Sequence, residues 1–297
     1  MTRSAILKPR RCALTLFSLL LLLIVAAPAF TQEKPVVVWY VLDFPPLLIA
    51  QGPAKGQGYM DVVMRQLIEQ TPEFTHRITH SNTKRIYDTI RDTPNLCNPS
   101  TLWTPERTEF MVFSQPILRW KGLPNGIIIR TRQATLFAPF LNTAGELQLE
   151  KLLTEFPFRI GIVPDRAYGT EIDQILARHR ERLVEVASSN QFASNLLKLA
   201  TQTEFDAVVG YAEELHYLIG SGAVPAEFQF LPIAEARHLL EGGIGCSKTE
   251  EGQRIMAAFD RILSHPEVQA VNEAAYLRWL PNDRLRAYYL QRKAEQK

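Results

Sequence analysis

One stretch decides how this chain is interpreted: Trp103-Thr104-Pro105-Glu106-Arg107, followed by Phe113-Ser114-Gln115-Pro116. Thr104 can cap a helix start, Pro105 suits the first helical position, and the charge of Glu106 favours the positive end of the helix dipole. The Arg107 side chain then projects from the first helical turn. Its planar guanidinium can bind a carboxylate through two parallel hydrogen bonds. The stretch predicts capture of a small carboxylate. The alternative is a surface capping box with a solvated arginine.

This stretch resembles the Thr-Pro-Glu-Arg and Phe-Ser-x-Pro-Tyr signature of the family 3 bacterial extracellular solute-binding proteins, the periplasmic amino-acid-binding class. The resemblance implies that Arg107 binds the α-carboxylate of a ligand. It also implies an α/β fold of the periplasmic binding protein type II, in which two open sheets with flanking helices are joined by two hinge crossings. Ser100 and Leu102 stand where the family has a glycine and a hydroxyl residue, and Ile117 stands where it has an aromatic, so the chain represents a diverged branch.

Residues 1 to 29 have the features of a secretory signal peptide. A basic start precedes an apolar region, Leu14 to Ala26, that is too short for a comfortable membrane span, and Ala27-Pro28-Ala29 forms a small-x-small cleavage site. Cys12 lies before the apolar region, so it is not the acylated cysteine of a lipoprotein cleaved after that region. We expect a mature protein in the periplasm, with a retained membrane anchor as the alternative.

The charge balance argues against a nucleic-acid partner. Four of the 33 basic residues lie in the signal, which leaves 29 against 31 acidic residues. A net charge near −2 gives no general attraction to a polyanion. The hydrophobic fraction of 46% is ordinary for a globular protein, and we expect a monomer.

The order of expected elements divides the chain between two lobes, with residues 30 to 122 and 238 to 297 in lobe 1 and residues 123 to 237 in lobe 2. In lobe 1, an apolar run from Val36 to Leu42 predicts a strand that Asp43-Phe44-Pro45-Pro46 ends at the edge of a cleft. Cys97 and Cys246 both fall in this lobe, 149 residues apart. An oxidising periplasm favours a disulfide between them over two buried free thiols.

In lobe 2, the run Phe158 to Val163 predicts a buried parallel strand, and a turn then leads into a helix near Glu171. Ligands of open α/β sheets bind at the carboxyl ends of strands, where helix starts offer free N–H groups. The turn therefore supplies candidate ligand-binding residues opposite Arg107: Arg166, Tyr168, Gly169 and Thr170. The alternative is a plain strand-to-helix turn.

The next predicted strand, Phe205 to Tyr211, resembles the Asp-Ala-Val strand of the family, in which a carboxylate pairs with the ligand's ammonium group. Tyr211 stands at that position, and Glu213 or Glu214 is close enough to substitute. The two glutamates are equally compatible with a solvated first turn of a helix.

Two aromatic residues beside turns, Phe44 and Trp103, are candidate walls of the cleft, whereas Trp39 is expected in the core. Ser100, just before the arginine motif, completes the candidate ligand-binding set. No metal-ligand spacing, phosphate loop, dinucleotide fingerprint or serine-nucleophile motif is present. We therefore expect no metal, no cofactor and no catalytic residue.

The sequence thus predicts a periplasmic protein that closes two lobes over a small carboxylate-bearing solute such as an amino acid. Its partner would be the permease of an ABC transporter or a membrane receptor. Two alternatives remain: a dehydratase-like periplasmic enzyme on the same fold, and a ligand-sensing module.

Overall fold

The computed structural model describes residue 2 and residues 33–81, 83–116, 119–164, 166–185, 191–201 and 204–296. Val36–Lys297 forms one compact unit, and Met1–Pro35 is a separate one. The predicted signal at residues 1 to 29 lies outside the described residues, apart from residue 2. Among the described helices, none combines the length and apolar character that a membrane crossing requires.

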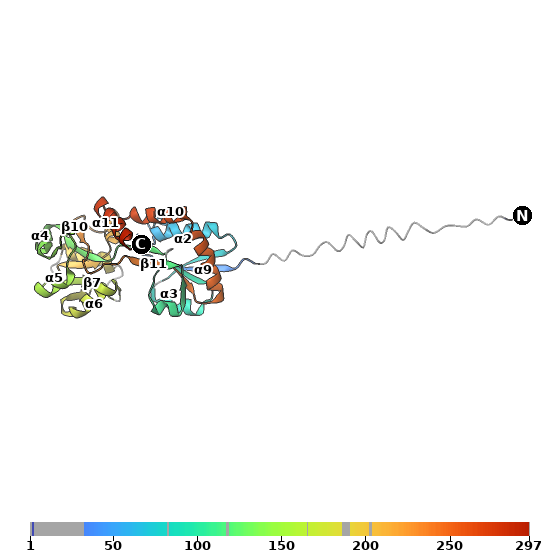
Figure 1. Cartoon of the computed structure of the whole chain (residues 1–297), viewed down its shortest axis with the longest axis horizontal. Coiled ribbons are helices and arrows are strands. Elements are labelled where there is room, and N and C mark those ends of the chain that lie inside the picture. The colour runs from blue at the N-terminus through green and yellow to red at the C-terminus, as the bar shows by residue number, and fades with distance from the viewer. Residues whose placement is uncertain are drawn as a thin grey trace. The chain divides into compact units, whose positions relative to one another are not determined.

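Two sheets organise residues 36–297 (Figure 1). The first sheet has the order β2-β1-β3-β11-β4, and β5 pairs with β11 outside this path. Its strands are β1 (Val36–Val41), β2 (Thr75–His80), β3 (Leu96–Leu102), β4 (Met111–Phe113), β5 (Trp120–Gly122) and β11 (Leu240–Ser247). β1 is parallel to β2 and β3, whereas β11 runs antiparallel to β3, β4 and β5.

The second sheet has the order β10-β6-β9-β7-β8. Its strands are β6 (Gly126–Arg130), β7 (Ile160–Ile162), β8 (Leu183–Glu185), β9 (Ala207–Gly210) and β10 (Phe228–Leu231). β7 is parallel to both β8 and β9, and β6 is antiparallel to β9 and β10. Every residue of β6 and β9 is buried, including the charged Arg130 at the end of β6.

The helices divide in the same way, and we call each sheet with its helices a lobe. The first lobe has α2 (Tyr59–Gln70), α3 (Thr83–Asp92), α9 (Glu250–Leu263), α10 (Pro266–Leu277) and α11 (Asp283–Glu295). The second has α4 (Ala134–Phe137), α5 (Leu149–Glu155), α6 (Thr170–Arg178), α7 (Gln191–Thr201) and α8 (Ala212–Gly220). The expected fold class, two sheets with flanking helices, is confirmed.

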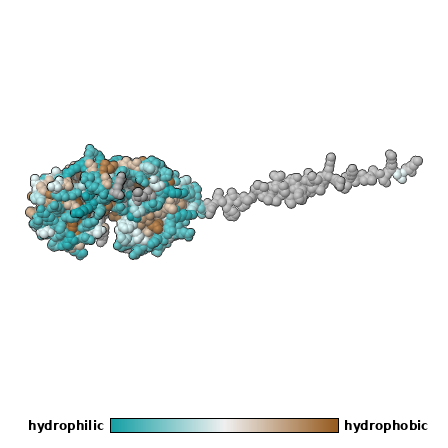
Figure 2. Space-filling view, in the orientation of Figure 1, coloured by the Kyte–Doolittle hydropathy of each residue, from teal (hydrophilic) through white to brown (hydrophobic). Residues whose placement is uncertain are grey.

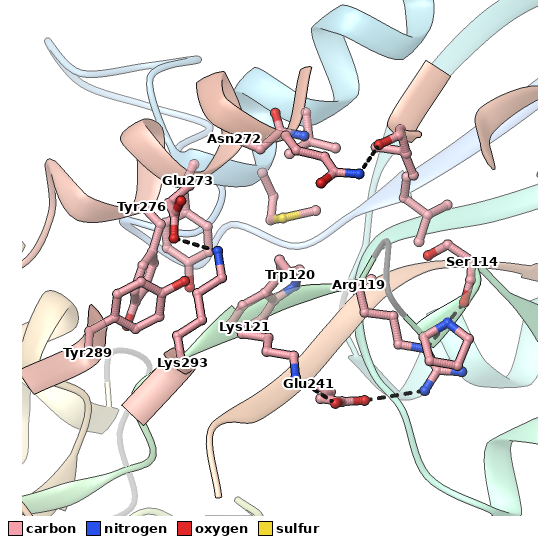
Figure 3. Close-up of a pocket in the computed structure, with 18 of the residues that line it drawn as sticks. Ser114, Arg119, Trp120, Lys121, Glu241, Asn272, Glu273, Tyr276, Tyr289 and Lys293 are labelled. Atoms are coloured by element: carbon pink, nitrogen blue, oxygen red, sulfur yellow. Dashed lines mark hydrogen bonds and ion pairs between the residues drawn. The ribbon is translucent and has the colours of Figure 1, made fainter. Parts of the chain in front are cut away.

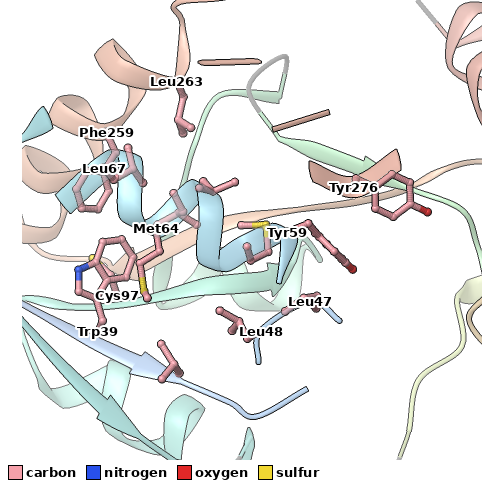
Figure 4. Packing of buried hydrophobic residues seen from close by; sticks show 14 of the residues in the cluster. Trp39, Leu47, Leu48, Tyr59, Met64, Leu67, Cys97, Phe259, Leu263 and Tyr276 are labelled. Carbon is pink, nitrogen blue, oxygen red and sulfur yellow. The ribbon is translucent and has the colours of Figure 1, made fainter. Parts of the chain in front are cut away.

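The core of the first lobe lies between its sheet and α2, α9, α10 and α11 (Figure 4). Trp39 is fully buried, stacks on Phe259 with ring centroids 5.1 Å apart, and donates its indole N–H to His76 at 3.0 Å. The prediction that Trp39 is a core residue is correct. The second lobe has two apolar clusters, one built around Phe137 and Ile160 and the other around Phe192 and Phe205.

The C-terminal helix α11 touches both lobes. Leu285 and Tyr289 are buried in the first lobe's core. The Tyr288 hydroxyl donates to Glu146 of the second lobe at 2.8 Å, and Arg292 donates to the Ala236 carbonyl at 3.1 Å. No helix is predicted here from the sequence, because the apolar residues of this segment do not gather on one clear face.

Cys97 and Cys246 lie opposite each other in the antiparallel pair of β3 and β11, and they form the expected disulfide. Both side chains are fully buried. The bond therefore joins an early and a late segment of the chain within one sheet.

Replacing both cysteines by alanine should lower the free energy of unfolding by about 4 to 5 kcal/mol, because the bond closes a loop of 149 residues in the unfolded chain. Urea unfolding of the oxidised protein and of the double variant measures this difference. Added reductant should lower the stability of the wild type and leave the variant unchanged. Equal stability of the two oxidised proteins would contradict the expectation.

Candidate functional site

The carboxyl ends of β7 and β9 bring two buried charges together. Arg166 follows β7, and Glu214 lies in the first turn of α8, which begins directly after β9. Arg166 donates from Nη2 to Glu214 Oε2 at 2.7 Å and from Nη1 to Glu214 Oε1 at 3.3 Å. Their side chains expose only 13% and 8% of their surface, respectively. This is a bidentate ion pair shielded from water, a geometry in which each charge depends strongly on the other.

Four aromatic rings surround the Arg166 guanidinium. Its Cζ lies 5.0 Å from the ring centroid of Tyr211, 5.2 Å from Phe192, 5.4 Å from Phe44 and 5.6 Å from Tyr168. Phe44 belongs to the first lobe, in the turn after β1, whereas the other three rings belong to the second. The site therefore includes residues of both lobes.

Both glutamates of α8 are buried, Glu213 at 3% and Glu214 at 6% exposure, so the solvated alternative is wrong. Burial raises the pKa of Glu213 to about 8, which keeps it protonated at neutral pH. Burial also raises the pKa of Glu214, and the Arg166 guanidinium opposes that rise. Burial lowers the pKa of Arg166, but the Glu214 carboxylate outweighs this effect and keeps the guanidinium charged. The site thus combines an ion pair with a neutral carboxylic acid.

The backbone N–H groups at the start of α6 have their hydrogen-bond acceptor within the helix itself. Gly169 has φ 115°, a conformation that favours glycine, and precedes the helix beginning at Thr170. The backbone N–H groups of Tyr168 and Gly169 donate to the Asp173 carboxylate at 3.0 and 3.3 Å. The hydroxyl of the buried Tyr168 accepts the Val163 N–H at 2.7 Å. The N–H donors of Tyr168 and Gly169 are thus directed at Asp173, whereas the Tyr168 ring lies beside Arg166.

Residues 123 to 125, between β5 and β6, form the first crossing from the first lobe to the second and pass beside Tyr168. Asn125, fully buried between β5 and β6, donates from Nδ2 to the Tyr168 carbonyl at 2.9 Å. The Leu123 N–H donates to the Tyr276 hydroxyl at 2.8 Å, which ties the crossing to α10. After burial, the Glu213 carboxylate is the largest cause of the raised pKa values of Tyr59 and Tyr276.

Arg107, the arginine of the Thr-Pro-Glu-Arg stretch, has a different environment from Arg166. The Arg107 N–H donates to Thr104 Oγ1 at 3.3 Å, as expected, but the helix there is only the four-residue 3-10 turn Glu106–Glu109. The Arg107 guanidinium donates to the Leu102 carbonyl at 2.6 Å and lies 4.5 Å above the Tyr87 ring. These partners all belong to the first lobe, and none of them is a residue that surrounds Arg166.

The other two predicted residues of this region also contact the first lobe. The Ser100 N–H donates to the Asn98 side chain at 3.0 Å. Trp103 is 40% exposed, and Arg119 lies 5.0 Å from its ring. A role of Ser100, Trp103 and Arg107 in ligand binding stays a prediction.

The first lobe contains a separate cavity of about 680 Å³ between α2, α10, α11, β5 and β11 (Figure 3). Tyr59, Trp120, Tyr276 and Tyr289 form its aromatic wall. Its charges are paired, Glu241 with Arg119 and Lys121, and Glu273 with Lys293. None of the predicted ligand-binding residues lines this cavity.

Of the predicted ligand-binding residues, the structure brings together Phe44, Arg166, Tyr168 and Tyr211. Phe192 and Asn125, which also lie there, were not predicted. Glu214 was named only as an alternative to Glu213. Phe192 lies on α7, where its spacing is that of a core residue, and no local signal marks it as a neighbour of Arg166. Within the described part of the chain, no group of histidine, cysteine, aspartate or glutamate side chains is arranged to hold a metal ion. The face shown in Figure 2 is mainly hydrophilic, with small scattered apolar patches.

Two mixed sheets, with β11 returning from the second lobe to the first, define the two-lobed fold of periplasmic binding proteins. Solved structures with this fold match the chain. A histidine kinase sensor domain with similarity to periplasmic binding proteins matches with a TM-score of 0.60 and 17% identity, covering 83% of this chain and 96% of that one.

The substrate binding protein of an amino acid ABC transporter matches with a TM-score of 0.57 and 11% identity, covering 83% of this chain and all of its own. The periplasmic VFT2 domain of Bordetella pertussis BvgS matches with a TM-score of 0.56 and 18% identity, covering 83% and 94%. No protein-family profile and no curated protein sequence matches the chain. At these identities the comparisons confirm the fold.

Replacing Glu213 by glutamine should flatten the pH dependence of stability. The folded pKa of Glu213, about 8, lies above the unfolded value of about 4.3, so the folded state binds more protons between these values. The contribution of Glu213 to stability is therefore full below about pH 4 and decreases as the pH rises toward 8.

The measurement is urea unfolding of the wild type and of Glu213→Gln from pH 4.5 to 8.5. The wild type should lose stability relative to the variant by at most about 1.4 kcal/mol per pH unit. Glu181→Gln, at an exposed position, is the control and should follow the wild type. Parallel curves for the wild type and Glu213→Gln would show that Glu213 titrates normally.

Proposed function

We propose that the protein binds a small carboxylate-bearing solute, such as an amino acid, in the cleft between its lobes. The observation that carries the proposal is the Arg166–Glu214 ion pair, buried at the carboxyl ends of β7 and β9 and covered by Phe44 of the first lobe. In open α/β sheets this edge is where ligands bind. The observed fold, which is built for hinge motion, supports the same function.

The chemistry of the pair suits a zwitterion. A guanidinium has five N–H donors, and Glu214 accepts two from Arg166, so further donors remain for a solute carboxylate. Glu214 and Glu213 are carboxyl groups that can receive an ammonium group. Without solute the two charges satisfy each other, which avoids an unpaired buried charge. Arg166, in place of Arg107, is therefore the proposed main anchor.

The proposed setting is the periplasm, where the protein acts as a monomer and delivers its solute to an ABC transporter permease or reports it to a membrane receptor. Structures described as an ABC transporter binding protein and as a kinase sensor domain share the fold, so the fold is compatible with either partner. Lobe closure on the solute would provide the signal in both cases.

We propose binding without chemical conversion. The dehydratase-like alternative needs a free general base in the cleft. Glu214 is held by Arg166, and burial keeps Glu213 protonated, so the resting arrangement does not supply such a base. Recovery of an unchanged solute after overnight incubation, followed by NMR, supports binding, whereas new product signals would favour the enzyme.

The direct test is a thermal-shift screen of amino acids and dicarboxylates against the refolded, solute-free protein. A solute at one hundred times its Kd should stabilise the folded state by about 2.7 kcal/mol. Arg166→Gln should remove this shift, because the amide cannot provide a charged donor fork.

Arg107→Ala is the matched comparison. If Arg107 is a second anchor, as the sequence motif predicts, its loss also weakens binding. If binding survives in Arg107→Ala and disappears in Arg166→Gln, the anchor is Arg166 alone. Absence of a shift with every compound for the wild type would contradict the proposed function.

A further inference from the structure

The environment of Arg166 also has the features of a receptor for guanidinium groups. We propose that the cleft contains a guanidinium-binding subsite that Arg166 itself fills, so that the site excludes free organic cations and selects anionic or zwitterionic solutes. The selection of solutes rests on the proposed function, whereas the filled subsite stands on geometry alone.

The site has the two features that bind a guanidinium group, which are aromatic ring faces and a carboxylate. Aromatic ring faces attract a flat cation when it lies within about 6 Å of their centroids. All four rings around Arg166, those of Phe44, Tyr168, Phe192 and Tyr211, satisfy this limit. The Glu214 carboxylate completes the subsite by accepting two N–H groups from one edge of the guanidinium plane. We call these four rings and Glu214 the cage.

Other arginines of the described chain show that this enclosure is unusual. Arg107 lies over one ring, that of Tyr87, and Arg119 over one ring, that of Trp103. Arg91 also lies over a single ring, that of Phe110, and is exposed. A single aromatic contact is common at protein surfaces, whereas a buried guanidinium with four rings and a bidentate carboxylate forms a complete binding site.

Because Arg166 fills the cage, the site discriminates between cationic and anionic solutes. A group on a short tether is present at an effective concentration in the millimolar range or above, so a free guanidinium solute must compete with Arg166 for the cage. A solute carboxylate meets no such competitor, because it can bind N–H groups of Arg166 that Glu214 leaves open. The same side chain thus blocks cations and attracts anions.

Removal of the Arg166 guanidinium should open the cage to a free guanidinium compound. Arg166→Ala deletes the fragment that corresponds to ethylguanidinium, which is therefore the probe. Millimolar ethylguanidinium chloride should raise the thermal midpoint of Arg166→Ala in a saturable manner, by about 3 to 6 °C at ten times its Kd. It should have no saturable effect on the wild type, whose cage is filled.

Two variants serve as controls. Arg107→Ala removes a half-buried arginine over a single ring and should show no saturable response. Arg166→Ala combined with Glu214→Gln keeps the rings but loses the carboxylate, and it should lose most of the response. An equal response of all the proteins, or no response of Arg166→Ala, would overturn the filled subsite.

A measurement on the wild type covers the case in which Arg166→Ala does not fold. The side-chain N–H groups of a caged arginine exchange slowly with solvent, so NMR of the arginine side chains should show a slowly exchanging guanidinium that disappears in the conservative variant Arg166→Lys. The buried Arg130, which donates to Gln133, should give a slow signal in both proteins and serves as the internal reference. If no slow signal disappears in Arg166→Lys, the proposal is also overturned. Neither experiment contains a carboxylate-bearing solute, so its failure leaves the thermal-shift test of solute binding unaffected.

Discussion

An arginine and a glutamate removed from water can remain charged only while each has the other as a partner, and this constraint governs the site at the carboxyl ends of β7 and β9. Arg166 comes from the turn after β7 and Glu214 from the helix after β9, so the pair fixes two neighbouring strand ends of the second lobe relative to each other. Phe44 extends the arrangement to the first lobe. Loss of either charge would leave its partner buried and unpaired.

The rest of the fold holds Arg166 and Glu214 in place. The first lobe is built around a large apolar core and a buried disulfide between β3 and β11, so the strand that returns from the second lobe is firmly anchored. Asn125 and Leu123 connect the first crossing to Tyr168 and Tyr276 on its two sides. Helix α11 spans both lobes. Rigid sheets joined by short crossings are the arrangement that permits hinge closure.

The sequence predicted the fold well, because apolar runs such as Val36 to Leu42 and Phe158 to Val163 are local signals of strands. It grouped Arg166, Tyr168 and Tyr211, which the structure brings together, because strand ends converge on one edge of an α/β sheet. It could not identify Glu214 as the partner of Arg166, or Phe192 as a neighbour, because these contacts depend on how α7 and α8 pack. The capping residues around Arg107 predicted its local turn but not the direction of its guanidinium, which points to Leu102 and Tyr87.

A double-mutant cycle on Arg166 and Glu214 tests most directly whether the cleft depends on their ion pair. The unfolding free energies of Arg166→Met, Glu214→Gln and the double variant are measured by urea denaturation at pH 7. Each single change should cost about 3 to 5 kcal/mol, because it leaves a buried group unpaired, and the double change should cost much less than the sum. Additive losses would mean that the two side chains do not interact in the folded protein, which would contradict the account.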